Sequence, residues 1–264
     1  MALEKPFAVL PLLIGKVRTG NERSNRPASN LGMLDLMGMT WRTDGSANAW
    51  AAGELFGPAS VDFVSVIAAN AQPGTTLRIR LGTSAAEVDG SSAAYDSGAQ
   101  TFVNPAVTLP SGLYHSHREF TAKTVTHWRI DAGNHTGDFE AAGLVLGKRI
   151  EPSEYYEKDY GFGLDDLGEL RRSRLGVPHE TPGVVDRKLD FRLGWTDREE
   201  YEERFRPLIE AVASRGIVFW CFNPEPSEHR QVNTYLGYFE DPPGVRGGSL
   251  GGKVNIDFRI RSII

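Results

Sequence analysis

Three histidines form the clearest constellation for chemistry in this 264-residue sequence. His115 and His117 stand two residues apart, so a strand would point both imidazoles to one side, and His127 could reach them from a neighbouring strand. Three such ligands can hold a catalytic zinc, which makes a metal-dependent hydrolase one hypothesis. No carboxylate is identifiable as the partner that orients ligand histidines, and Glu119 comes very soon after His117. We therefore predict surface or loop histidines, and no bound metal or other cofactor.

Paired carboxylates are a second source of chemistry, because two of them can share acid and base roles. Asp131, Asp138 and Glu140, or Asp165 with Asp166, would supply such a pair, but no spacing selects one pair among 34 acidic residues. The sequence has no G-x-S-x-G elbow, no phosphate-binding G-x-x-x-x-G-K-[ST] loop and no H-E-x-x-H helix. Its glycine-rich stretches, GFGLDDLG and GVRGGSLGG, do not open helices after strands and predict turns. We expect no catalytic residue and no enzyme.

Five tryptophans are candidates for a sugar-stacking platform, since carbohydrate sites combine flat apolar faces with polar groups. Trp128 and Trp220 lie in apolar strand-like runs, which predicts core positions. Trp41 and Trp50 flank the loop TDGSANA and are expected to be partly exposed. Trp195 completes the set. The single cysteine follows Trp220 in the run IVFWCF, which predicts a small buried thiol.

The first half of the chain has the pattern of short antiparallel strands. Residues 60–150 alternate apolar and polar side chains, with breaks at glycine, proline and asparagine. In TLRIRLG, Leu77, Ile79 and Leu81 share one face, whereas VDFVSVIAA is continuously apolar, as expected for a strand covered on both sides. We predict a mainly β protein whose first domain, residues 1–152, is a β-sandwich.

The character of the sequence changes at residues 151–174, which are charged, aromatic and without period-two order. This segment is either an extended linker lying over the first domain or the irregular start of a second one. Residues 153–264 then combine apolar strands with one helix at about 197–215, a β-rich α+β domain. Thr196 and Glu199 match a capping box, and Pro207 predicts either a kink or a division into two short helices. The closing KVNIDFRIRSII gives the strongest strand pattern.

The charge balance and the lengths of the apolar runs limit the classes of partner that this protein is expected to have. The formal net charge is −5, from 29 basic and 34 acidic residues, without a basic block, which argues against nucleic acid. No run approaches the 18 or so apolar residues of a membrane-spanning helix, and the first strand-like patch lacks a signal-peptide cleavage site. We expect a soluble protein.

The strand order of residues 30–152 resembles the galactose-binding-like, discoidin-type jelly roll. The stretches that carry the resemblance are MTWRTDGSANAW, ELFGPASVDFVSVIAAN, TTLRIRLGTS, VDGSSAAYDSG and AKTVTHWRIDAGNHTGDFEAAGLVLGKRIEPS, with an exit from Gly147 to Pro152. The resemblance covers slightly less than half of the chain and implies a possible carbohydrate ligand, without assigning binding residues.

The second part looks like the C-terminal half of tail proteins of phages and prophages. The relevant stretches are RRSRLGVPHETP, KLDFRLGWTDREEYEERFRPLIEA, RGIVFWCFNPEP, TYLGYFEDPPG and NIDFRIRSII. This resemblance implies a structural component of the distal tail or baseplate, assembled in the bacterial cytoplasm. Its partners would be other tail proteins, further copies of the chain in a symmetric ring or hub, and a host-surface glycan. A stand-alone lectin-like module is the alternative.

Overall fold

The computed structural model describes residues 5–157, 159–213, 215–248 and 251–264. They form two compact units. The jelly-roll unit comprises Ala8–Arg149 and Asn223–Asn233, and the arm unit comprises Ile150–Phe222 and Thr234–Ile264 with residues 5–7. Strands β1 (Phe7–Val9) and β11 (Arg149–Ile150) lie where the chain passes from one unit to the other.

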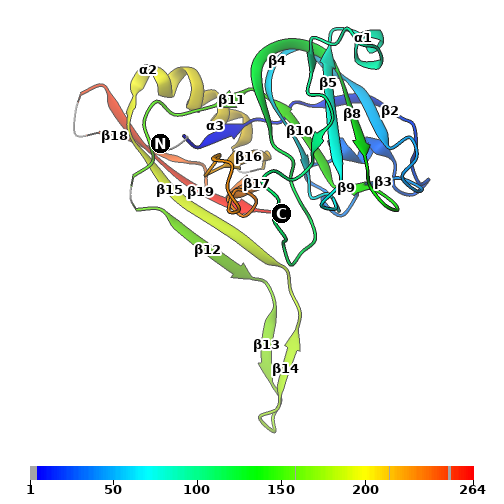
Figure 1. Cartoon of the computed structure of the whole chain (residues 1–264). Helices are drawn as coiled ribbons and strands as arrows, with labels where there is room; N and C mark the ends of the chain where they lie inside the picture. Colours follow the sequence, from blue (N-terminus) through cyan, green and yellow to red (C-terminus); the bar gives the residue numbers. More distant parts are fainter. Residues whose placement is uncertain (1–4, 158, 214, 249–250) are drawn as a thin grey trace. The chain divides into compact units, whose positions relative to one another are not determined.

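The jelly-roll unit is a sandwich of antiparallel strands (Figure 1). Its main sheet has seven strands in the order β10-β4-β8-β5-β6, with β2 added to β4 and β7 to β5, and β3 pairs with β9 separately. The elements are β2 (Ile14–Thr19), η1 (Ala28–Gly32), β3 (Trp41–Arg42), β4 (Trp50–Ile67), β5 (Thr76–Gly82), α1 (Ala85–Asp89), β6 (Tyr95–Asp96), β7 (Gln100–Thr101), β8 (Arg118–Gly133), β9 (Glu140–Ala141) and β10 (Gly143–Gly147). The predicted β-sandwich is confirmed.

The longest strand, β4, pairs with three strands, and its pairing with β8 is interrupted near its middle. Glu54 pairs with His127 and Ala59 with Val125, so residues 55–58 of β4 face only one residue of β8. Gly57 and Pro58 lie in this interruption, and proline cannot donate a ladder hydrogen bond. The first half of β4 pairs with β2 and the second half with β10.

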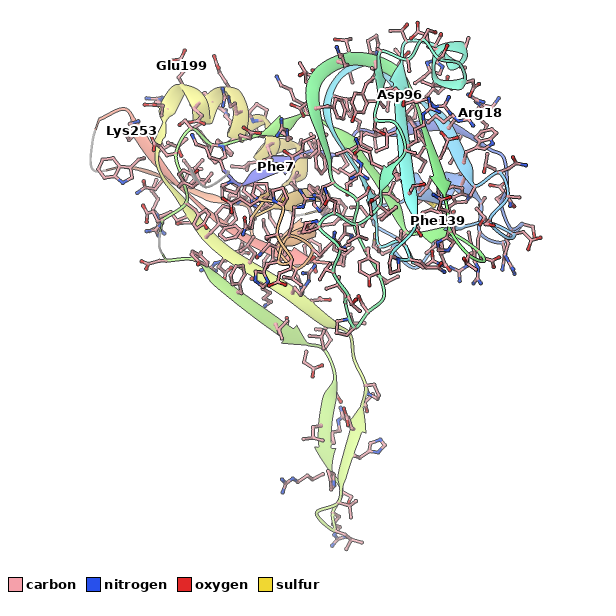
Figure 2. All side chains as sticks on the ribbon, in the orientation of Figure 1. Phe7, Arg18, Asp96, Phe139, Glu199 and Lys253 are labelled. Carbon is pink, nitrogen blue, oxygen red and sulfur yellow. The ribbon has the colours of Figure 1, made fainter. Side chains whose placement is uncertain are left out.

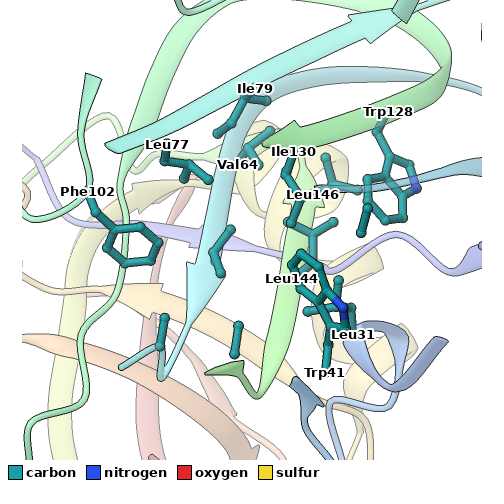
Figure 3. Packing of buried hydrophobic residues seen from close by; sticks show 14 of the residues in the cluster. Leu31, Trp41, Val64, Leu77, Ile79, Phe102, Trp128, Ile130, Leu144 and Leu146 are labelled. Carbon is teal, nitrogen blue, oxygen red and sulfur yellow. The ribbon is translucent and has the colours of Figure 1, made fainter. Parts of the chain in front are cut away.

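The core of the jelly-roll unit is built from the alternating side chains of these strands (Figure 3). Leu77, Ile79 and Leu81 of β5 are fully buried, as their alternation predicts. Trp128 is also fully buried. Trp41 is fully buried as well, so the expectation of partial exposure is wrong. Its ring packs edge-on against Phe139 at 5.6 Å, and its indole N–H donates to the Asn21 carbonyl, which makes this loop-flanking tryptophan part of the core.

The arm unit contains a sheet with the strand order β16-β17-β19-β15-β12, in which β18 also pairs with β19. Strands β13 and β14 form a separate hairpin. The strands are β12 (Gly161–Asp166), β13 (Glu169–Arg172), β14 (Pro178–Thr181), β15 (Val185–Asp197), β16 (Val218–Cys221), β17 (Thr234–Phe239), β18 (Gly244–Gly247) and β19 (Lys253–Ser262). Trp220 and Cys221 are buried in β16, as predicted.

The predicted helix is present but differs in detail. It runs through α2 (Arg198–Glu200), the π-helical η2 (Tyr201–Phe205) and α3 (Arg206–Val212). Pro207 falls at the start of α3, directly after the wider π turn, because its ring and missing N–H do not fit a continuous α-helix. The predicted capping box is wrong: Thr196 is a buried strand residue paired with Val254, and Asp197 precedes the first turn.

Candidate functional site

The three histidines do not form the strand-borne set considered from the sequence. His115 and His117 precede β8 in irregular chain, as the predicted loop position requires, but both are buried, so the alternative surface position is wrong for them. The Ala68 N–H donates to His115 Nδ1 at 3.1 Å, whereas His127 lies on β8 with Nδ1 2.9 Å from Thr126 Oγ1. No three metal-ligating side chains group together in the described part of the chain.

His115 instead belongs to a buried polar contact within the jelly-roll unit. Its backbone N–H donates to Gln231 Oε1 at 2.8 Å, and its carbonyl accepts from Gln231 Nε2 at 2.8 Å. The neighbouring Arg230 is also buried and donates to the carbonyls of Pro224 and Asn104. These bonds attach the segment Asn223–Asn233 to the jelly-roll unit, although more than one hundred residues separate Gln231 from His115 in sequence.

His117 is expected to make the stability of this unit depend on pH. Burial lowers the pKa of His117 well below its ordinary value of 6.5, and the positive charges of Arg230, His115 and Arg118 lower it further. Below about pH 6.5 the unfolded chain binds a proton that the folded chain does not. Unfolding free energy should therefore fall toward pH 5 by up to about 1.4 kcal/mol per unit. Denaturant titrations at several pH values should show a smaller decrease in unfolding free energy in H117Q and an unchanged decrease in the exposed control H229Q. If the unfolding free energy of H117Q depends on pH as that of the unaltered chain does, the prediction is contradicted.

Trp50 is half-buried, but its ring is already occupied. The guanidinium of Arg129 lies 4.2 Å from the ring centroid, and that of Arg18 lies 5.6 Å from it. Asp89 bridges both arginines at 2.8 Å. These cation–π and ion-pair contacts cover the apolar face that a sugar would need. Trp50 therefore serves a structural network.

Asp138 and Glu140, which the sequence offered as possible acid–base partners, are bound by arginines. This arginine cluster consists of Arg23, Arg26 and Arg42 around the two carboxylates. Arg23 and Arg42 lie 2.7 and 2.9 Å from Asp138, and Arg26 lies 3.0 Å from Glu140. The Gly45 N–H, which donates to Asp138 at 2.8 Å, and then Arg42 lower the pKa of Asp138. An aspartate that stays ionised can bind the neighbouring arginines but cannot act as a proton donor.

The most unusual feature of the arm unit is a hairpin that leaves the sheet. We call residues 167–184 the arm; they comprise β13, β14 and their turns (Figure 1). Every residue of β13 and β14 is exposed, and within the described residues the two strands pair only with each other. Figure 2 shows their side chains projecting on both sides of the strands. The exposed apolar side chains include Leu170 at 71% and Leu175, at the tip, at 90%.

Charged side chains hold the root of the arm, the point at which β12 ends at Asp166 and β15 begins at Val185. Asp165 and Asp186 are paired across β12 and β15, and Arg261 of β19 bonds to both carboxylates. Lys188 lies 3.3 Å from Asp165 and 3.0 Å from Glu240; the hydrogen bond to Glu240 is the main cause of its raised pKa. The sheet is thus ordered up to the point at which the arm begins.

Gly183 is expected to control the direction of the arm. A Cβ at this position would lie 2.1 Å from the backbone nitrogen of Gly168, closer than the opposing strand can tolerate. G183A should therefore separate the two arm strands and weaken any association made by the arm, with little change in the melting temperature of the sheet. The matched control is G163A, whose Cβ would lie 3.5 Å from Lys188 Cβ, an ordinary contact. Equal association of both variants in sedimentation would disprove this role.

Trp195 is the tryptophan that the structure exposes, with 51% of its surface accessible. Its pairing with β19 is irregular between Leu193 and Thr196, and its backbone has φ +62°, a left-handed conformation that is rare for bulky residues. The bulge turns the indole out of the core face that the alternation of Leu189, Phe191 and Leu193 would extend. Such strain is typical of functional sites.

Trp195 borders what we call the β15 groove, two hollows of about 520 and 580 Å³ that share Glu157. Trp195, Tyr155, Tyr156 and Gly194 line the second hollow with Glu154 and Lys253. The charged side chains of the first hollow are Glu157, Asp159, Asp190, Arg192, Asp241, Arg246, Asp257 and Arg259. Acidic residues outnumber basic ones in each hollow, so the groove combines aromatic and acidic lining residues.

The sequence allows two roles for residues 151–174, a linker or the start of a second domain, and the structure places them in the arm unit. Tyr156 and Tyr160 pack against Phe222 at 4.3 and 5.3 Å. The sequence contained no periodic signal for the arm, because strands exposed on both faces need no alternation. The scattered leucines and valines among its glycines and charges were the available signal.

No protein-family model matches the sequence, and no curated protein matches it. Solved structures are similar to about half of the chain. The chitosan-binding module 1 of a chitosanase/glucanase from Paenibacillus sp. IK-5 is 14% identical, with 53% of this chain and 98% of that chain covered and a TM-score of 0.35. The CBM32 of AlyQ in complex with 4,5-unsaturated mannuronic acid is 19% identical, with 52% and 96% covered and a TM-score of 0.36. XRCC1 bound to the DNA pol beta catalytic domain is 11% identical, with 53% and 99% covered and a TM-score of 0.37.

These similarities are too low for any of the three functions to be transferred to this chain. No helix among the described residues is long and apolar enough to cross a membrane.

Proposed function

We propose that this chain is a non-enzymatic structural component of a multisubunit assembly and that the arm builds it into that assembly. The arm carries the proposal. An isolated two-stranded hairpin is at best marginally stable in water, and unpaired strand edges are templates for pairing with another chain. Here such a hairpin exposes Leu167, Leu170, Leu175, Val177 and Val184. Burial of these side chains and strand edges in an assembly would stabilise the hairpin and protect its edges from unspecific pairing.

Within this class, we propose the distal tail or baseplate of a phage as the location. The resemblance of the second part of the sequence to phage tail proteins supports this finer assignment, and the chain would then be assembled in the host cytoplasm. Negative-stain microscopy of virions that encode the chain, labelled with an antibody against it, tests the location. We expect label at the tail end; unlabelled tails would exclude the virion location and leave the assembly role to be tested separately.

Carbohydrate binding by the jelly-roll unit is a second candidate function, and the arginine cluster favours it. Arg23, Arg26 and Arg42 keep about two fifths of their side-chain surface exposed (44, 37 and 40%) while Asp138 and Glu140 fix their positions. Ordered guanidinium groups donate well to carboxylates and hydroxyls. The favoured ligand is therefore an acidic glycan.

A glycan array probed with the full chain tests this second function. We expect binding to uronate-containing glycans that R42A weakens tenfold or more, because a hydrogen bond to a charged group contributes about 1.5–3 kcal/mol. K123A, which removes an exposed charge from β8, is the control and should bind normally. Absence of binding to every acidic glycan would reject the hypothesis. Tight binding by a chain that never enters particles would favour a stand-alone lectin.

A further inference from the structure

The arm tip cannot occupy the β15 groove of its own chain. The arm leaves the ends of β12 and β15 and projects beyond the sheet (Figure 1). The tip residue Leu175 lies nine residues beyond Asp166, which is roughly 30 Å at about 3.3 Å per strand residue. Asp190 and Trp195 lie on β15 on the other side of the root. A return of the tip to this groove would require the pairing of β12 with β15 to break.

We infer that the β15 groove is the socket for the arm tip of a second copy of this chain. The inference rests on the proposed assembly function, and it names the partner and the contact surface. Two independent properties of tip and groove support it: their charges and their apolar surfaces.

The charges of the two surfaces are complementary. Arg171, Arg172 and Arg174 surround the tip; Arg172 and Arg174 form no ion pair with any residue that the structure describes. In the groove, Asp190 and Asp241 are exposed and likewise have no ion-pair partner within the described chain. Arginines bind carboxylates with directional, paired hydrogen bonds, which fixes the orientation of a docking segment.

The apolar surfaces also match. Leu175 and Val177 are 90% and 60% exposed at the tip, and the bulge at Gly194 presents Trp195 next to Tyr155 at the groove wall. Exposed aromatic residues beside a hollow are favoured anchors for a partner's aliphatic side chains. A Cβ at Gly194 would lie 2.0 Å from Glu157 Oε1, so glycine lets this carboxylate lie against the strand beside Trp195.

A tip that enters the groove of the next copy makes a head-to-tail contact. The two surfaces are different, so each copy offers one tip and one groove, and repetition generates a closed ring or an open helix.

Cross-linking between separately labelled copies tests the contact. One chain carries L175C and another carries Y155C; Cys221 is buried and should stay unreactive. A short bis-maleimide reagent should link the two only after they are mixed, giving a product of two chains. The control L13C, at an exposed position of the jelly-roll unit, should not link to L175C. Linkage of L175C to itself, or none in the mixture, would overturn the assignment.

Charge reversal tests the same contact without new cysteines. R172E/R174E and D190R/D241R should each raise the dissociation constant at least tenfold, and the two variants mixed together should associate again. K123E/K148E, with the same charge change at exposed positions of the jelly-roll unit, should associate normally. If deletion of the arm abolishes association but the mixture is not rescued, the socket is wrong and the proposed function stands. If the intact chain never associates, both are wrong.

Discussion

A chain in which residues 167–184 are replaced by Asn-Gly is expected to remain a monomer at concentrations at which the intact chain assembles. The replacement removes the exposed leucines and valines of the arm. Burial of each such side chain stabilises a complex by about 1.5–3 kcal/mol before ordering costs, so loss of several should abolish association. Asp166 and Val185 face each other in the register, and a two-residue Asn-Gly turn connects such a pair directly.

The shortened chain should otherwise fold normally. The ion pairs of Arg261 and Lys188 with Asp165 and Asp186 lie on the retained side of the root. Sedimentation velocity measures the mass, and thermal unfolding checks the fold. A shortened chain that still assembles as the intact chain does would show that another surface holds the copies together.

Q231A is expected to destabilise the jelly-roll unit by at least about 2 kcal/mol. The substitution removes both hydrogen bonds to the buried backbone of His115, and a buried backbone group that loses its partner costs roughly 1–3 kcal/mol. Truncation at residue 152 should be harmful for the same reason, because it removes the whole segment Asn223–Asn233 from this unit.

Urea unfolding followed by a signal from the jelly-roll unit measures the effect of Q231A. The matched control is Q100A, at an exposed strand position, where we expect a change below about 0.5 kcal/mol. If Q231A and Q100A unfold at the same urea concentration, Gln231 does not hold the segment in place.

The sequence predicts those elements that have one buried face. Strands β5 and β19 follow period-two patterns, and the helix from Arg198 follows a helical one, because burial of one side selects apolar residues at fixed spacing. The cap of that helix was mispredicted at Thr196, since pairing with Val254 keeps this residue in the strand. Tertiary contacts here outweigh the local capping preference.

The candidate site was largely beyond prediction from sequence. The arm has no buried face and hence no period, and Trp195 leaves the alternation of its strand only because of a bulge at Gly194. Trp41 was misassigned to a partly exposed position because its burial depends on Phe139, nearly one hundred residues away. The hydrogen bonds between Gln231 and His115 likewise join residues that are distant in sequence, so no local pattern predicts them.

The mass of the intact chain as a function of concentration tests the central claim, arm-mediated assembly, most directly. Sedimentation equilibrium at micromolar concentrations should give a multiple of the single-chain mass of 29.0 kDa, and dilution should dissociate the assembly. A mass of 29.0 kDa at every concentration, with the arm intact, would contradict the account.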